Sequence, residues 1–148
     1  MDNIFYYNTN VEWNEGRKGS LTESNFPLIE VATPPEFPKG VPNVWSPEHL
    51  FVASVNICLM TTFLAIAENS KVNFVSYKCS GVGKLEKVDG KFMMSEITLK
   101  PEIVVQEEKD IERTERIIHK SENHCLISNS IKTKVILEPV IKTVLMNE

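Results

Sequence analysis

Cys58 has the clearest chemical potential in this sequence, because it is a cysteine in the middle of a long apolar stretch. The stretch runs from Ser46 to Glu68, SPEHLFVASVNICLMTTFLAIAE, and contains no charged residue between Leu50 and Ala67. A thiol in such surroundings is either a small hydrophobic core residue or a reactive group held in a dry pocket. The thiolate is the nucleophilic form, so a reactive Cys58 requires a nearby positive charge.

Arg17 is the candidate source of that charge. It lies in the segment Gly16-Arg17-Lys18-Gly19, where the glycines allow close backbone approach and the planar guanidinium can make forked hydrogen bonds. Glu48 would then hold Arg17 through a bidentate ion pair. Glu48 and Cys58 are separated by about 15 Å along one helix, because each residue adds 1.5 Å of rise. If the two residues act together, the helix must bend or the site must be shared between two subunits.

The other two cysteines, Cys79 and Cys125, are widely spaced. An odd number of distant cysteines argues against a disulfide scaffold and against a CxxC metal or redox motif. In a reducing cytosol, a pair among them is more often catalytic or transient than structural. His119 and His124 are not four residues apart and so do not stack on one helix face as metal ligands would. The sequence therefore predicts no metal site, and it indicates no cofactor.

The central stretch is predicted to be a helix that begins at Ser46. Ser46 can cap the helix, Pro47 suits its first position, and Glu48 places a carboxylate near the positive end of the helix dipole. Apolar residues occupy every side of this helix, so it must be covered all round. A single sheet covers only one side, and a second copy of the same helix could cover the other. We therefore expect a homodimer.

Strands with antiparallel pairing are expected around this helix. Asp89-Gly90 is a strong hairpin signal, and Gly81 and Gly83 suggest a bulge. The expected strands lie at residues 4–7, 11–13, 21–32, 71–88, 91–105 and 131–140, and a second, amphipathic helix is expected at residues 108–123. This order predicts one α+β domain over residues 1–148.

Composition excludes several classes of function. The chain has 148 residues, 42% of them hydrophobic, and a net charge of -4, so nothing in its charge favours nucleic acid as a partner. The uncharged run is long enough for a membrane span, but polar residues inside it and the absence of flanking basic residues favour a core helix. The N-terminus lacks the pattern of a secretory signal, and we expect a cytoplasmic protein.

Three segments together resemble the OsmC/Ohr superfamily of thiol-dependent peroxidases, named for osmotically inducible protein C and organic hydroperoxide resistance protein. The segments are residues 16–19, residues 46–50 leading to Cys58, and His124-Cys125-Leu126-Ile127-Ser128. The Glu-to-Cys interval and the order of elements also match the family. The third segment departs from the Pro-Tyr-Ser type of sequence that many peroxidase members carry after the cysteine, which indicates a less characterised OsmC-like branch.

The resemblance implies an OsmC-like fold, with antiparallel sheets wrapped around a long buried central helix in an intertwined homodimer. It implies that Cys58 is the peroxidatic thiol, Cys125 the resolving thiol, and Arg17 and Glu48 the activating pair. Such a protein reduces organic (fatty or alkyl) hydroperoxides to alcohols, and the Cys58 sulfenic acid condenses with Cys125 to a disulfide. An external dithiol, such as a lipoylated protein, would then restore the thiols.

Two other classes of function use the same residues. In one, a non-catalytic protein binds an apolar small molecule in the dry dimer cavity, so that Cys58 is unreactive and Cys125 dispensable. In the other, the same thiols oxidise, but the result is a changed surface for a partner. Turnover with a dithiol distinguishes the peroxidase from both.

Overall fold

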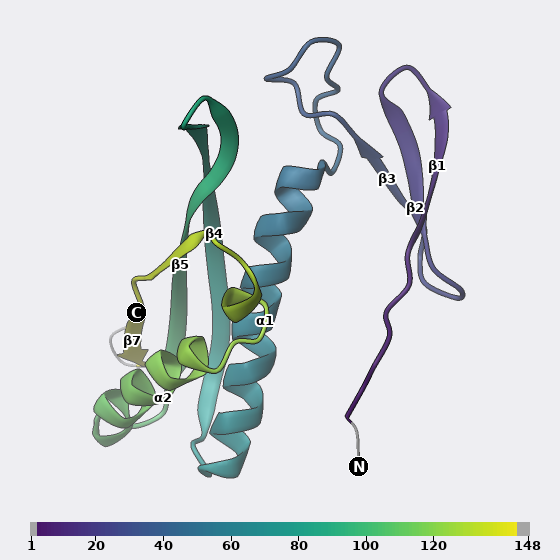
Figure 1. The fold of residues 1–148 in the computed structure, drawn as a ribbon. Helices are drawn as coiled ribbons and strands as arrows, with labels where there is room; N and C mark the ends of the chain where they lie inside the picture. The colour runs from purple at the N-terminus through teal and green to yellow at the C-terminus, as the bar shows by residue number, and fades with distance from the viewer. Residues whose placement is uncertain (1–2, 145–148) are drawn as a thin grey trace. The chain divides into compact units, whose positions relative to one another are not determined.

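The computed structural model describes residues 3–144. The chain divides into two compact units, one ending at Leu50 and the other beginning at Phe51. The first unit contains a small sheet and the start of the central helix. The second contains the rest of that helix, a larger sheet and a second helix (Figure 1).

The sheet of the first unit has three antiparallel strands in the order β1-β2-β3. These are β1 (Asn10–Glu15), β2 (Lys18–Thr22) and β3 (Ile29–Ala32). Gly16 adopts a φ of 54° at the turn between β1 and β2, a left-handed conformation that glycine reaches without strain. The predicted strand at residues 4–7 is wrong, because this segment pairs with no strand within residues 3–144 and its large side chains are exposed.

The central helix, α1 (Pro47–Asn69), confirms the prediction to within one residue at each end. Ser46 caps it as expected, because Ser46 Oγ accepts a hydrogen bond from the backbone N–H of His49 at 3.1 Å. The helix has one face that packs in the core of the second unit, formed by Val55, Cys58, Leu59, Phe63 and Ala67.

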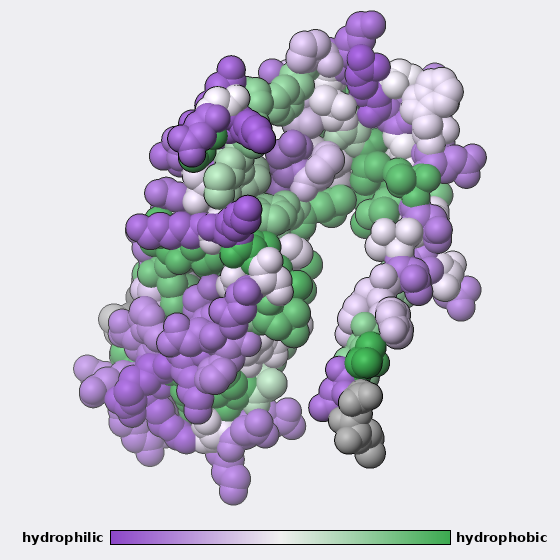
Figure 2. Space-filling view, viewed as in Figure 1, coloured by the Kyte–Doolittle hydropathy of each residue, from purple (hydrophilic) through white to green (hydrophobic). Residues whose placement is uncertain are grey.

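The opposite face of α1 is exposed in the single chain. Ile57 is 56% exposed and Leu64 is 40% exposed, and Figure 2 shows hydrophobic residues along the part of the surface that α1 occupies. The sheet reaches only one side of the helix, so the expected burial on all sides does not occur within one chain. Of the helices in the described part of the chain, only α1 is long and apolar enough to cross a membrane, a criterion that core helices also meet.

The larger sheet is built on a long hairpin. Its strands β4 (Phe74–Val88) and β5 (Lys91–Val105) pair antiparallel, and the predicted turn is confirmed by positive φ angles at both Asp89 and Gly90. Two short strands, β6 (Lys134–Leu137) and β7 (Val140–Thr143), run parallel to β5 along its other edge. A single strand was expected at residues 131–140. Pro139 has no N–H for a ladder, and the chain leaves the sheet there.

Gly81 and Gly83 serve close packing rather than a bulge. The irregularities in the β4 ladder lie between Phe74 and Ser76 and between Lys84 and Leu85. A Cβ atom added at Gly83 would lie 2.4 Å from Val52 Cγ2 on α1. These glycines therefore allow the helix to lie directly against the sheet.

The second helix is preceded by a short 3₁₀ turn, η1 (Glu108–Asp110), and followed by another, η2 (Ser128–Ser130). The helix itself, α2 (Ile111–Asn123), is amphipathic as predicted, with Ile117 and Ile118 in the core and hydrophilic residues over its outer surface (Figure 2). The result is the expected α+β fold, in which the named strands pair antiparallel except for β6 and β7, which run parallel to β5.

Candidate thiol active site

Cys58 and Cys125 are brought to the site by different elements. Cys58 lies on the inner face of α1, is 8% exposed, and has its Sγ 4.0 Å from Thr62 Oγ1 one turn along. Cys125 follows α2 directly and is fully buried. A tight turn holds it there, because the Cys125 N–H donates to the Glu122 carbonyl at 3.1 Å and the Cys125 carbonyl accepts from the Asn129 N–H at 3.0 Å.

The two thiols are neighbours in the folded chain. The Cys58 thiol lies within hydrogen-bonding reach of the Cys125 thiol, and both are free rather than disulfide-bonded. Burial, with a further contribution from Cys58, raises the pKa of Cys125 to about 11. Two buried thiols within reach of each other are the arrangement from which an internal disulfide can form.

A polar cluster surrounds Cys125. Ser128, at the start of η2, lies close to the side chains of both Glu122 and Cys125 and opposes the rise in their pKa values. Glu122 Oε2 and Ser128 Oγ are buried and have no hydrogen-bond partner of good geometry among the described residues. Burial raises the pKa of Glu122, because it disfavours the charged carboxylate. Glu122, three residues before Cys125, thus brings a carboxyl group to this cluster, and Ser128, three residues after Cys125, brings a hydroxyl.

Tyr77 and Cys79 on β4 face the same cluster. The Tyr77 hydroxyl is buried without a well-formed partner, and burial, together with Cys79, Cys125 and Glu122, raises its pKa. Burial also raises the pKa of Cys79, and the interaction with the Tyr77 hydroxyl partly lowers it again. Cys79 is half-buried at the edge of the core.

The sequence did not point to Glu122, Ser128 or Tyr77. Glu122 carried a weak signal, because it is four residues after the inward-facing Ile118 and therefore on the inner side of α2. Tyr77 and Ser128 carried none. Their proximity to Cys125 depends on how β4, α2 and η2 pack together.

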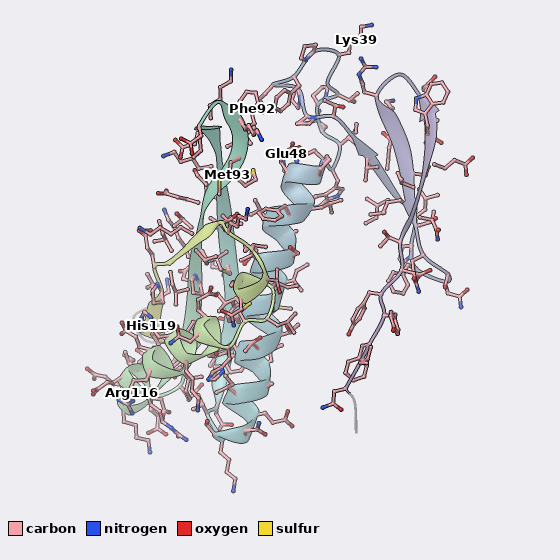
Figure 3. All side chains as sticks on the ribbon, viewed as in Figure 1. Lys39, Glu48, Phe92, Met93, Arg116 and His119 are labelled. Carbon is pink, nitrogen blue, oxygen red and sulfur yellow. The ribbon has the colours of Figure 1, made fainter. Side chains whose placement is uncertain are left out.

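Arg17 and Glu48 belong to the first unit of the chain, whereas the cluster around Cys125 belongs to the second. Arg17 is exposed in the turn between β1 and β2. Glu48, labelled in Figure 3, is half-buried in the first turn of α1. Within residues 3–144 the two side chains form no ion pair, and Glu48 Oε1 is buried without a hydrogen-bond partner. A single chain therefore leaves this carboxylate oxygen available to a donor.

Metal-ligating residues do not gather in the described part of the chain, where no group of three or more His, Cys, Asp or Glu side chains could hold an ion. His119 lies on the exposed side of α2 near Arg116 (Figure 3). Thiol chemistry is thus what the arrangement of side chains offers.

Comparison with known proteins shows the family of this chain. The model of the OsmC-like protein family matches residues 40–139, and the chain belongs to that family. An OsmC-like protein of unknown function from Vibrio cholerae has the same fold, with a TM-score of 0.85 and 25% identity over 93% of this chain and 100% of that one. An organic hydroperoxide resistance protein from Elizabethkingia anophelis shares the fold, with a TM-score of 0.72 and 19% identity over 94% of this chain and 98% of that one.

Among curated proteins, the uncharacterized protein YmaD of Bacillus subtilis is 23% identical over 140 residues, which cover 93% of this chain and 92% of that protein. The family includes organic hydroperoxide resistance proteins, so the fold and the family expected from the sequence are confirmed. Proteins of this family are soluble, and α1 is the core helix of their fold rather than a membrane span.

Proposed function

We propose that this chain is a cytoplasmic thiol-dependent peroxidase that reduces organic hydroperoxides to alcohols. The observation that carries the proposal is the contact between the buried thiols of Cys58 and Cys125. Membership of a family that includes organic hydroperoxide resistance proteins supports it. The apolar side chains around Cys58 on α1 suit a hydroperoxide with a hydrocarbon group better than hydrogen peroxide.

The reaction has two steps on the protein. The Cys58 thiolate attacks the distal oxygen of the hydroperoxide, the O–O bond breaks, and the alkoxide leaves and takes a proton to become the alcohol. Cys58 has then lost two electrons and is a sulfenic acid. The Cys125 sulfur attacks the Cys58 sulfur, a disulfide forms, and the sulfenic oxygen leaves as water. An external dithiol, for which a lipoylated protein is the candidate, reduces the disulfide by thiol–disulfide exchange.

Arg17 and Glu48 are proposed as the activating pair for Cys58. The Arg17 guanidinium would favour the thiolate and stabilise the charge that develops on the leaving oxygen. Glu48 would orient Arg17, and its unpartnered Oε1 is the acceptor that a guanidinium requires.

We further propose that two copies of the chain form a homodimer through the exposed face of α1. Ile57, Met60 and Leu64 follow one another at helical spacing on this face, and each is at least 36% exposed in the single chain. A second copy would place the same stripe against the first, since a two-fold interface is self-complementary. This arrangement would cover the side of the helix that the sheet leaves open.

Charge introduced into the stripe is expected to separate the dimer. Leu64→Glu would bring two carboxylates together in an apolar contact, so we expect the variant to sediment as a monomer at chain concentrations where the parent is a dimer. Analytical ultracentrifugation measures this directly. His119→Glu introduces a carboxylate on the exposed side of α2 and is the matched control, which is expected to remain dimeric. A monomeric parent chain would contradict the proposed dimer.

The peroxidase proposal is tested by the fate of the thiols. The reduced protein is treated with one equivalent of cumene hydroperoxide, the free thiols are counted, and disulfides are mapped by mass spectrometry. We expect the rapid loss of two thiols with a Cys58–Cys125 linkage, absent in Cys58→Ser and in Cys125→Ser. If the thiols stay reduced, or Cys58→Ser oxidises as fast as the parent, the proposal fails and a protein that binds an apolar ligand becomes the better account.

A further inference from the structure

Cys125 faces a chemical difficulty at its position in the fold. It is fully buried, and its pKa is raised to about 11, so at neutral pH it carries a proton and is a poor nucleophile. The groups that bear on it are Cys58 from α1, Tyr77 from β4 and Ser128 from its own segment. None of these carries a positive charge that would favour the thiolate. To form a disulfide, Cys125 needs a group that accepts its proton.

Glu122 and Ser128 are placed to supply that group. The turn at Cys125 holds Glu122 three residues before it and Ser128 three residues after it, through the backbone hydrogen bonds of Cys125 with Glu122 and Asn129. The Ser128 hydroxyl is close enough to the Cys125 thiol and to the Glu122 carboxyl to lower the pKa of each, so both groups are within its reach. Ser128 Oγ and Glu122 Oε2 are both buried without a well-formed hydrogen bond, which leaves each free to receive a proton.

We propose that Glu122 accepts the proton of Cys125 through the Ser128 hydroxyl when Cys125 attacks oxidised Cys58. This inference rests on the proposed function, since it assigns residues to its second step. Glu122 acts through Ser128 and is a positioning and proton-accepting residue, whereas Ser128 touches the reacting sulfur. The thiol, the hydroxyl and the carboxylate form one path for the proton, from the reacting sulfur of Cys125 to the end of α2.

The step balances without any further reagent. The S–H bond of Cys125 breaks, its proton passes to Ser128, and the Ser128 proton passes to the Glu122 carboxylate. An electron pair on the Cys125 sulfur forms the S–S bond with the Cys58 sulfur, and the S–O bond of the sulfenic acid breaks. The leaving hydroxide takes back one proton and departs as water, so Glu122 ends as a carboxylate. The oxidation number of the Cys125 sulfur rises by one, and that of the Cys58 sulfur falls by one.

The environment of Glu122 suits this role. The groups facing it are Ser128 from η2 and Tyr77 and Cys79 from β4, all of them uncharged when protonated. Burial raises its pKa above that of an exposed carboxyl, which makes the carboxylate a stronger base. A purely structural Glu122 would contribute packing alone and would leave the pH dependence of disulfide formation unchanged.

The first test separates the two chemical steps. Sulfenic acid at Cys58 is trapped with dimedone, and disulfide formation is followed by rapid quenching and mass spectrometry after addition of cumene hydroperoxide. In Glu122→Gln we expect an unchanged rate of sulfenic acid formation and disulfide formation slowed by about 100-fold at pH 7, the usual size of a general-base contribution. Ser128→Ala is expected to have the same effect, and Ser128→Thr, which keeps the hydroxyl, is expected to restore the rate. Glu115→Gln, on the exposed side of α2, is the matched control.

The pH profile is the readout that a structural role would not change. In the parent, the rate of disulfide formation should rise as pH passes the pKa of Glu122 and then level off above that pKa. In Glu122→Gln, the rate should keep rising about tenfold per pH unit towards the pKa of Cys125, because hydroxide must then remove the proton. If the parent and Glu122→Gln have the same pH profile, the inference is overturned. It is also overturned if Glu122→Gln slows sulfenic acid formation as much as it slows disulfide formation.

A second measurement needs no hydroperoxide, so it tests the relay even if the proposed function fails. In a Cys79→Ser background, one equivalent of 5,5′-dithiobis(2-nitrobenzoate) places a thionitrobenzoate group on Cys58, and attack by Cys125 releases it with a coloured signal. The same dependence on Glu122, Ser128 and pH is expected for this release. If the parent forms no sulfenic acid with hydroperoxide, the peroxidase proposal falls. If release is unaffected by Glu122→Gln, the relay falls.

Discussion

Cys58→Ser is expected to abolish the dithiol-dependent reduction of cumene hydroperoxide, with a loss of at least about a thousandfold in turnover, as is usual when a covalent nucleophile is removed. A serine hydroxyl is nearly isosteric with the thiol but does not form a reactive anion at neutral pH, so the O–O bond has no nucleophile to break it. The substitution leaves α1 otherwise intact, because Cys58 makes only a long contact with Thr62 there.

Variants of the other two cysteines are the controls for Cys58→Ser. Without a dithiol, Cys125→Ser should complete a single turnover and then accumulate Cys58 sulfenic acid, since no internal thiol remains to resolve it. Trapping with dimedone measures this accumulation. Cys79→Ser should turn over like the parent, and peroxide consumption with dithiothreitol as the reductant compares it with Cys58→Ser. A Cys58→Ser protein that still consumes hydroperoxide with dithiothreitol would remove Cys58 from the mechanism.

Phe63→Ala is expected to lower the free energy of unfolding by about 3–5 kcal/mol, the range for deleting a buried aromatic side chain. Phe63 is fully buried on α1, and its ring lies 5.3 Å from that of Phe74 and 5.4 Å from that of Tyr77, measured between centroids. Its removal leaves a cavity between the helix and β4. A domain of this size is stable by only about 5–15 kcal/mol, so the variant should approach the limit of folding.

Urea unfolding followed by circular dichroism measures this loss, with all proteins at one chain concentration because a dimer dissociates on unfolding. Phe92→Ala is the matched control. Phe92 is 58% exposed on the hairpin, and its ring contacts Lys87 Nζ at 5.3 Å, a contact expected to contribute about 1 kcal/mol or less. Equal losses in the two variants would show that Phe63 is not a centre of the core.

Elements whose signals are local in the sequence were predicted well. The caps of α1 depend on Ser46, Pro47 and Glu48, which are adjacent, and the hairpin turn depends on Asp89 and Gly90 alone. β5 has the predicted bounds, because its alternating residues reflect one buried face. The errors occurred where a distant segment decided the outcome. Residues 4–7 have apolar side chains but no strand beside them, and Gly81 and Gly83 lie beneath α1 rather than at a bulge.

The amino-acid sequence by itself determined the family and the α+β class, and it predicted Cys58 and Cys125 as the candidate thiols, because these depend on short motifs and on periodicity along the chain. Only the tertiary structure decided that Cys58 and Cys125 are neighbours and that Glu122, Ser128 and Tyr77 surround Cys125. It also decided which side of α1 is buried and which is left exposed. The reason is physical: burial and side-chain contact arise when segments far apart in the sequence pack together, and no local pattern specifies which residues will meet.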